Sequence, residues 1–395
     1  MKYRILILTI TILSTTGIKA QQINIAGSLN SFSFDMYKQL KSDNENLFFS
    51  PFSIDIALLM TREGAKSDTK SGFDKVLHVD SNVNSKLVRD FILNIKSFKD
   101  SSNRLNVSNA IWINRYYKIK TDFQYRIQTN YFAEAFRIDF LDQNKAANKI
   151  NRWAALKTNN LIKNIISLDQ FTIDLKLILT NVIYFIDKWD KPFERYLTKE
   201  DVFYGVNSET TKTDFMHETG LMNYFENGDF QFIAKYYKGN DKSFCVILPK
   251  TRYGISAIES VMDKSLFDSI FNHVASIEVD LSIPKFKMEK SYSLNKSLSN
   301  LGLKKAFTTA DFTGISTTSR LQISKVTHKT FIEVSEEKTE AAAVTTVSYS
   351  DGLMPVDDQK PKPKEFKANH PFIFMIIDSK TKGIIFMGRY VNAQE

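Results

Sequence analysis

The sequence predicts an α+β fold, because helical patterns come first, strand patterns follow, and the two do not alternate along the chain. Before Leu177, most segments carry apolar side chains three and four residues apart, which is the spacing of a helix with one buried face. After Phe193, short apolar runs dominate. Helices and strands segregated in this way are typical of the α+β class, whereas strictly alternating βαβ units would indicate a parallel α/β sheet.

The first part of the chain is expected to be mainly helical. The predicted helices cover Ile25–Leu40, Ser53–Arg62, Lys70–Leu77, Lys86–Phe98, a segment that begins at Thr121, and Asn148–Ile165. One strand pattern interrupts them at Asn106–Ile119, where Val107, Asn109, Ile111 and Ile113 alternate with other side chains.

The second part is expected to be mainly β-structure. Leu177–Phe185 is rich in Leu, Ile, Val and Tyr and has the length of a fully buried strand. Further strands are predicted at Phe230–Tyr237, Ser243–Pro249, Ser276–Phe286, Leu321–Val334, Phe372–Ile377 and Gly383–Tyr390, with one short helix at Leu294–Leu301. The segment Ser348–Asn369 has three prolines and an Asp-Gly pair, which predict a long exposed loop.

The N-terminus has the pattern of a signal peptide. Lys2 and Arg4 precede an apolar run, and Ala20 ends a segment of small and polar residues at which cleavage is expected. The run is too short to span a bilayer. We therefore expect residues 1–20 to be removed, residues 21–395 to form one domain, and the mature protein to be secreted, extracellular and not bound to a membrane.

The charge distribution gives little support to nucleic-acid binding. The formal net charge is +9 and falls to +6 when Lys2, Arg4 and Lys19 leave with the signal peptide, and both signs are interspersed along the rest of the chain. One basic cluster lies on or just after a predicted helix and comprises Lys86, Arg89, Lys96, Lys99 and Arg104. It is a candidate site for a sulfated polysaccharide, and the simpler interpretation is a solvated helix face.

Enzyme and metal motifs are missing from the sequence. The five histidines do not form a HExxH pattern, and neither a GxGxxG nor a Walker loop is present. Cys245 is the single cysteine, so it has no internal disulfide partner, and its apolar surroundings predict a buried, inert thiol. We therefore expect no metal, no cofactor and no catalytic residue, and the protein is not expected to be an enzyme.

One stretch, Glu336–Thr346, carries two conflicting patterns. Its first part is composed mostly of good helix formers. From Thr339 onward it also has a period of two, which places four uncharged residues on one face: Thr339, Ala341, Ala343 and Thr345. Small uncharged residues on one face suit a strand inserted between two existing strands over a packed core. The alternative is an Ala-rich surface loop.

Several motifs in chain order together resemble the serpins, the serine protease inhibitor family, over nearly the whole mature chain. The matching motifs are Asn46–Ile54 (NLFFSPFSI), Leu179–Phe185 (LTNVIYF) with Trp189 and Pro192-Phe193, Ile283–Phe286 (IPKF), Leu301–Leu303 (LGL) with Ala306-Phe307, Ala310–Ile315 (ADFTGI), Val326–Lys329 (VTHK), Pro371–Phe374 (PFIF) and Phe386–Arg389 (FMGR).

The resemblance implies one domain with three β-sheets, eight or nine helices and an exposed reactive loop at about residues 338–366. It also implies a monomeric inhibitor that a target protease attacks as a suicide substrate. The cut loop of the acyl-enzyme then inserts as a new strand into the large sheet, a strand-addition switch. The implied partner is an extracellular serine protease, with a cysteine protease as the alternative.

The resemblance also assigns roles to individual residues. The hinge, from which insertion starts, comprises Glu336, Glu337, Lys338, Thr339, Glu340, Ala341, Ala342, Ala343, Val344 and Thr345. The region where the sheet must open comprises Ser50, Ser53, Asn181, His328, Trp189 and Lys285. Within it, Trp189 marks the place where the loop first enters, and Glu336 is expected to pair with Lys285.

The family spacing places the reactive bond at Gly352-Leu353, with a shift of one residue, to Asp351 or Met354, as the alternative. Between Lys338 and Lys360 there is no Arg or Lys, which disfavours trypsin-like targets and favours chymotrypsin- or elastase-like ones. Lys338 stands where the family usually has Gly, and we expect slower insertion from this departure. A non-inhibitory carrier or chaperone with the same fold is the alternative function.

Overall fold

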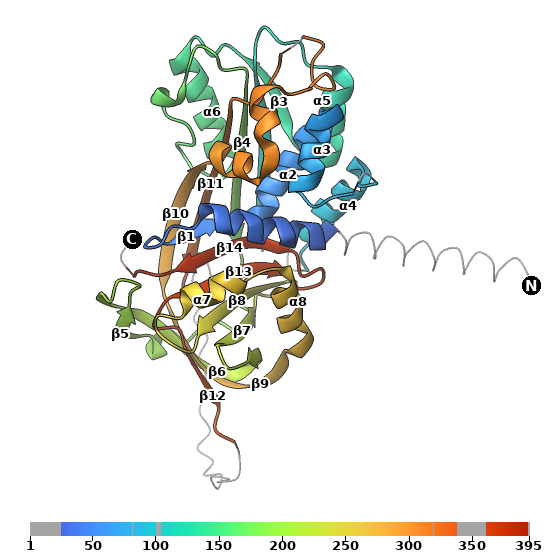
Figure 1. Cartoon of the computed structure of the whole chain (residues 1–395). Coiled ribbons are helices and arrows are strands. Elements are labelled where there is room, and N and C mark those ends of the chain that lie inside the picture. Colours follow the sequence, from blue (N-terminus) through green and yellow to red (C-terminus); the bar gives the residue numbers. More distant parts are fainter. Residues whose placement is uncertain (1–24, 81, 100–103, 319, 338–360, 394–395) are drawn as a thin grey trace, which may run out of the picture.

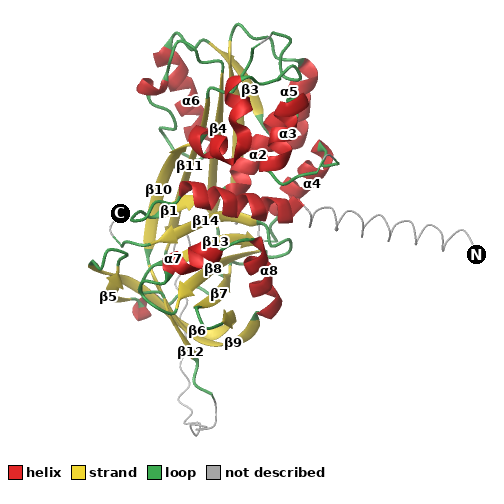
Figure 2. Cartoon of the chain, viewed as in Figure 1, coloured by secondary structure: helices red, strands yellow, loops and turns green. Residues whose placement is uncertain are grey.

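The structure is a computed structural model that describes residues 25–80, 82–99, 104–318, 320–337 and 361–393. Helices and strands lie in one elongated body in which the five-stranded sheet and most helices form one end and the nine-stranded sheet forms the other (Figures 1 and 2). The expected signal peptide, the hinge from Lys338 onward and the expected reactive bond lie outside the described residues.

The helices appear where the sequence predicts them, with shifted ends. A first helix covers residues 25–40. The others are α2 (Pro51–Arg62), α3 (Ser67–Val76), α4 (Ser85–Ile95), α5 (Thr121–Tyr131), α6 (Gln143–Lys157), α7 (Ile255–Val261), α8 (Lys264–His273), and a broken helix of α9 (Asn295–Leu298), η3 (Ser299–Leu303) and α10 (Lys304–Thr308). Counting that broken helix once, the described part of the chain holds nine, as expected. Two short 3-10 turns are η1 (Leu168–Gln170) and η2 (Arg195–Leu197).

Helix α2 begins at a well-formed cap and is buried on every side. The Oγ of Ser50 accepts a hydrogen bond from the backbone N–H of Ser53 at 3.1 Å, and Pro51 occupies the first helical position, where its missing N–H costs nothing. Every residue from Pro51 to Arg62 is buried. Helix α2 is thus a central rod of the fold rather than a surface helix.

The five-stranded sheet has the order β10-β11-β4-β2-β3. Its strands are β10 (Phe286–Ser293), β11 (Lys325–Val334), β4 (Leu177–Ile186), β2 (Arg104–Asn114) and β3 (Glu134–Ile138). Strands β4 and β11 are its two central neighbours and run parallel, whereas β10 on β11 and β2 on β4 pair antiparallel.

The second sheet has nine strands in the order β1-β14-β13-β8-β7-β6-β9-β12, with β5 paired to β6. The strands are β1 (Leu47–Phe49), β14 (Ile384–Tyr390), β13 (Phe372–Asp378), β8 (Lys242–Pro249), β7 (Phe230–Tyr236), β6 (Thr210–Glu226), β9 (Ala275–Pro284), β12 (Lys364–Lys367) and β5 (Lys199–Tyr204). The expected third sheet is the small one that β5 forms with β6, and the 17-residue β6 joins it to the rest. The α+β class is confirmed.

Several boundaries differ from the sequence prediction. The predicted helix Asn148–Ile165 is instead α6, which ends at Lys157 because Asn159 and Asn160 adopt left-handed φ angles of 49° and 64°. The predicted strand Ser276–Phe286 divides at Lys285 into β9 and β10. The predicted strand Asn106–Ile119 ends as β2 at Asn114. The expected reactive loop to residue 366 is shorter, because β12 already begins at Lys364.

Most buried apolar side chains form one continuous core between the helices and both sheets, and a smaller core lies under α6. Cys245 is fully buried in the large core, and burial raises the pKa of its thiol. In the part of the chain that the structure describes, no helix is long and apolar enough to cross a membrane.

A buried ionic group ties the first helix to α7 and β14. The guanidinium of Arg389 (2% exposed) donates to Oε1 of Glu259 at 2.8 Å, and the hydroxyl of Tyr37 donates to the same oxygen at 2.6 Å. Lys41 pairs with Oε2 of Glu259 at 3.1 Å. Burial raises the pKa of Tyr37 well above its ordinary value. These three elements are therefore linked by charge as well as by packing.

Replacing Arg389 by Met should lower the free energy of unfolding by about 3 kcal/mol, because the carboxylate of Glu259 stays buried without its strongest partner. Chemical denaturation at neutral pH measures this loss. The matched control is Lys41→Met, whose amine is partly exposed and should cost under about 1 kcal/mol. Equal losses in the two variants would contradict this account.

Candidate functional site

The candidate site is the seam between the parallel strands β4 and β11. Their pairing runs from Lys325 opposite Ile178 to Thr330 opposite Ile183. Beyond that point both strands continue, β11 to Val334 on its partner β10 and β4 to Ile186 on its partner β2, without pairing to each other in the described chain. The sheet is therefore already parted at this end, and each facing edge has backbone groups that a further strand could pair with.

A buried hydrogen-bonded group lies beneath the paired part of the seam. Nε2 of His328 on β11 accepts a hydrogen bond from the backbone N–H of Ser50 at 3.0 Å, and Nδ1 of His328 contacts Oδ1 of Asn181 on β4. The amide nitrogen of Asn181 donates to the carbonyl of Ser53 at 2.8 Å. The hydroxyl of Ser50 donates to the carbonyl of Ile385 on β14 at 2.6 Å. Both strands of the seam are thus fastened to the start of α2.

These contacts determine the protonation of His328. Because Nε2 accepts from Ser50, the ring is neutral and its proton lies on Nδ1, from which it donates to Asn181. The side chain is fully buried, and burial lowers its pKa from the ordinary value to about 3. No described acid acts on the pKa of His328, so a positive charge there would be buried without compensation. His328 is therefore a structural hydrogen-bonding group and not a general base.

The first two hinge residues lie at the parted end of the seam. A carboxylate oxygen of Glu336 pairs with Nζ of Lys285 at 3.1 Å, as predicted, and accepts a hydrogen bond from the hydroxyl of Thr198 at 2.9 Å. The backbone carbonyl of Glu336 accepts from the N–H of Phe193 at 3.0 Å. Burial would raise the pKa of Glu336, but its own backbone N–H, Lys285 and Thr198 outweigh burial and lower it. Glu337 pairs with Arg195 at 2.9 Å.

Trp189 lies at the same end. Its indole Nε1 donates to the carbonyl of Ser335 at 2.8 Å, and its ring stacks on Tyr237 with centroids 4.7 Å apart. The ring of Phe193 meets Trp189 edge-on at 5.8 Å. The amine of the buried Lys235 lies 4.6 Å from the centre of the Phe193 ring and 5.7 Å from that of Trp189. This aromatic group fixes the position from which the hinge leaves β11.

The structure therefore places all six predicted sheet-opening residues along one seam, in two groups. Ser50, Ser53, Asn181 and His328 form the buried group, and Trp189 and Lys285 contact the chain at Ser335-Glu336. The sequence analysis missed Asn109, which contacts Asn181, and the anchors Thr198 and Arg195. Asn109 is a polar residue in line with the apolar Val107, Ile111 and Ile113 of a predicted strand, and this exception was the sequence signal of a buried polar contact. No sequence pattern marked Thr198 or Arg195 as a contact of the hinge.

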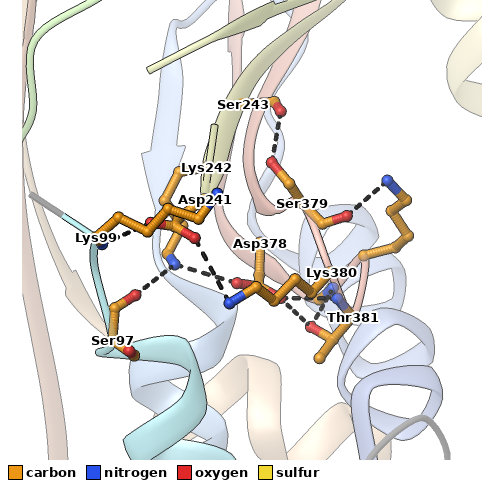
Figure 3. A network of polar contacts seen from close by, with 11 residues as sticks. Ser97, Lys99, Asp241, Lys242, Ser243, Asp378, Ser379, Lys380 and Thr381 are labelled. Carbon is orange, nitrogen blue, oxygen red and sulfur yellow. Dashed lines mark hydrogen bonds and ion pairs between the residues drawn. The ribbon is translucent and has the colours of Figure 1, made fainter. Parts of the chain in front are cut away.

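The residues predicted to bind a polysaccharide do not all present free charges. The amine of Lys99 donates to the carbonyl of Gly239 at 3.2 Å, and its backbone N–H donates to Asp241 at 2.7 Å. Asp241 belongs to the polar network in Figure 3, in which Lys242 pairs with Asp378 at 3.1 Å. The amine of Lys96 lies 5.7 Å above the ring of Phe132, and burial lowers its pKa.

The remaining two of these residues belong to α4. Lys86 is exposed, and Arg89 is partly buried. Lys86 and Lys99 are the exposed residues of the four, but Lys99 holds a turn in place and Lys96 packs against an aromatic ring. These side chains therefore have different local contacts and do not form the single charged surface that their spacing in the sequence suggests. Within the described residues, no group of three or more His, Cys, Asp or Glu side chains could hold a metal ion.

Comparison with known proteins identifies the family and the fold. The family model described as Serpin (serine protease inhibitor) matches residues 27–393. The chain is a serpin. An uncharacterized serpin-like protein of Thermococcus kodakarensis is 37% identical over 381 residues, covering 95% of this chain and 88% of the relative. The leukocyte elastase inhibitor of Xenopus tropicalis is 31% identical, covering 93% and 99%. The solved structure of the thermophilic serpin tengpin in its native state has a TM-score of 0.83 and 30% identity, covering 93% and 94%.

Members of the serpin family are typically non-enzymatic inhibitors. The seam, its buried group and the anchors at Ser335–Glu337 are the parts of this serpin on which a loop-insertion mechanism would act.

The neutral, buried His328 should make the stability of this serpin fall with acid. Its folded pKa lies below its unfolded value of about 6.5, so the contribution of His328 is complete above pH ~6.5 and is lost progressively as pH falls toward about 3. Between pH 7.5 and 5 the loss from this residue is about 2 kcal/mol. Urea denaturation at the two pH values, for the natural chain and for His328→Gln, measures it, and an identical pH dependence in the variant would contradict the assignment.

The Glu336–Lys285 pair should contribute only modestly to stability, since Lys285 is one-third exposed. A double-mutant cycle with Glu336→Gln and Lys285→Met should give a coupling energy of about 0.5–1 kcal/mol in urea denaturation. Lys285 also lies 3.7 Å from Asp214, so Asp214→Asn is the matched control and should show weaker coupling to Lys285→Met. A coupling near zero for Glu336 would mean that the pair does not hold the hinge.

Proposed function

We propose that this serpin is a secreted inhibitor of serine endopeptidases and acts on them as a suicide substrate. The observation that carries the proposal is the parted end of the β4–β11 seam, at which the chain leaves β11 with its first hinge residues anchored. A strand that continues from Glu336 would turn back between β4 and β11 and pair with both. Secretion rests on the signal-peptide pattern of residues 1–20 alone.

The proposed reaction begins on the target enzyme. Its serine hydroxyl attacks the carbonyl of Gly352, an ester forms between Gly352 and the enzyme, and the Gly352-Leu353 bond breaks. Leu353 leaves with a free amine, so the segment from Glu336 to Gly352 is no longer held at its far end. Insertion of this segment moves the attached protease on the order of 40 Å, at about 3.3 Å for each of some 13 residues. Distortion then stops the ester from being hydrolysed.

Residue chemistry in the hinge supports insertion. Thr339, Ala341, Ala343 and Thr345 would face the core, and none of them is charged. The core on which the seam packs is built mainly of apolar side chains, and the buried group around His328 is hydrogen-bonded. A new strand would add backbone hydrogen bonds to both edges, so the uncut chain would be the less stable state. Lys338 stands where the family usually has Gly. Because lysine has less backbone freedom than glycine, the cut loop should insert more slowly than in relatives with Gly.

The proposed targets are chymotrypsin- or elastase-like enzymes. The absence of Arg and Lys between Lys338 and Lys360 disfavours trypsin-like ones, and a relative 31% identical is named leukocyte elastase inhibitor. The reactive bond is proposed at Gly352-Leu353, with a register shifted by one residue as the alternative. The alternative function is a carrier or chaperone that does not insert its loop, and Lys338 is the feature that favours it.

Incubation with chymotrypsin and with elastase should give a complex that survives SDS, visible by gel electrophoresis, and mass spectrometry of the released peptide should locate the cut. The variant Ala343→Arg should lose the complex and be cleaved as an ordinary substrate, because insertion would bury an unpaired charge at a cost of several kcal/mol. The matched control Ala342→Arg, on the opposite face, should still form the complex.

The inhibitor proposal would be contradicted if the protease cleaved the natural chain, recovered its full activity and left the thermal stability of the chain unchanged. That result would favour the carrier function.

A further inference from the structure

A basic hollow lies among four helices at the end of the molecule remote from β12. Helices α2, α3, α4 and α5 gather on one side of the five-stranded sheet, whereas β12 lies at the opposite end (Figure 1). The hollow has a volume of about 350 Å³ and is lined from the end of α2 through the starts of α3 and α4 to α5. It is separate from the seam and from the aromatic group at Trp189.

The most buried charged side chain of the hollow belongs to Arg62, the last residue of α2. Arg62 is only 4% exposed. Its Nε pairs with Asp74, and its Nη1 donates to the carbonyl of Val83 at 3.2 Å. Its third nitrogen, Nη2, is buried and makes no hydrogen bond to any described protein group. A buried guanidinium nitrogen without a partner is costly, so this atom marks a place where an acceptor is needed.

Three further cations line the same hollow. Lys66 and Lys70 belong to the start of α3, and Arg126 belongs to α5. Neither lysine amine forms an ion pair with an acid of the described chain, and Arg126 meets Glu63 only at 3.7 Å. Glu63 is the single carboxylate of the lining, and the hydroxyl of Tyr131 already donates to it at 2.8 Å. Positive charge thus exceeds negative charge in the hollow.

Two helix starts add to this positive field. Asn84 and Ser85, at the start of the 11-residue α4, line the hollow, and so do Lys66 and Lys70, which lie on either side of the first three residues of the 10-residue α3. No side chain caps the start of α3. Helix N-termini favour negative groups, because their backbone N–H groups and aligned dipoles point outward. Arginine adds a planar fork that binds two oxygens of one tetrahedral anion.

We infer that this hollow is a binding site for a small tetrahedral oxyanion, either free inorganic phosphate or the phosphate group of a monoester. Arg62 supplies its free Nη2 at the base, Lys66, Lys70 and Arg126 supply charge at the rim, and the helix starts supply the field. The volume is within the range of roughly 300–1,000 Å³ that is usual for small-molecule sites. The inference does not depend on the inhibitory function.

The site differs from the basic cluster on α4. Lys86 projects from the same helix but does not line the hollow, and Lys96 and Lys99 contact Phe132 and Gly239. A long sulfated polysaccharide would be recognised by exposed charges spread along a surface. A buried guanidinium at the base of a hollow instead suits one compact, doubly charged group.

The test is isothermal titration of inorganic phosphate, and in a second arm glycerol 3-phosphate, into the full chain at constant ionic strength. Saturable binding is expected, together with a rise in thermal midpoint in phosphate relative to chloride. Lys66→Met/Lys70→Met should weaken binding at least about tenfold, the effect of losing ~1.4 kcal/mol. The two arms distinguish the sources, because an ester that binds more tightly than phosphate identifies a monoester as the preferred ligand.

The matched control is Lys75→Met/Lys86→Met. It removes the same amount of charge from exposed positions of α3 and α4 that lie outside the hollow. It should bind phosphate as the natural chain does. Arg62→Lys keeps the charge but removes the fork and should weaken binding while the chain still folds. The inference would be overturned if both double-lysine variants weakened phosphate binding equally, or if binding did not saturate. It would also be overturned if the chain bound heparin through Lys86 and did not bind phosphate.

Discussion

The hydrogen bonds of His328 are the constraint on which the rest of the structure depends. One neutral imidazole joins β11 to the start of α2 through Ser50 and to β4 through Asn181, and Ser50 in turn reaches β14. Four elements from both sheets and the central helix therefore meet at one buried polar group. Such a group is stable only when every member has a partner. Loss of one partner affects both strands of the seam at once, so the seam is held closed in a cooperative way.

Strands β4 and β11 are paired at one end of the seam and separated at the other. From Lys325 to Thr330, β11 pairs with β4 and covers the His328 group. Beyond Thr330, the strands part, and the chain is kept in place by side chains: Trp189 on Ser335, and Lys285 and Thr198 on Glu336. Side-chain anchors cost less to break than a backbone ladder, which makes this end the natural starting point for any further strand. Aromatic packing around Trp189 keeps that starting point fixed while the chain beyond it changes.

The sequence predicted the regular elements better than the contacts that connect them. Residues 25–40 and the two C-terminal strands have strong periodic patterns and were found nearly to the residue, and the start of α5 at Thr121 was also predicted. Helix α6 was misplaced because its apolar period continues past Lys157, and only the left-handed φ angles of Asn159 and Asn160 end it. Strand β6 was missed because its exposed half alternates Thr, Lys and Asp without apolar residues. The ion pair of Glu336 and Lys285 followed from the family resemblance, whereas Thr198 and Arg195 reach the hinge from an irregular segment that no local pattern marks.

The placement of the three tryptophans gives this serpin a built-in optical reporter. Trp112 of β2 and Trp153 of α6 pack together, with ring centroids 5.9 Å apart. Trp189 lies alone at the other end of β4, with its indole N–H bound to Ser335 and its face on Tyr237. Indole emission responds to hydrogen bonding and to neighbouring rings. In a chain with phenylalanine at positions 112 and 153, the fluorescence would come from one residue that contacts the base of the hinge, so the movement of that segment could be followed in time without an attached dye.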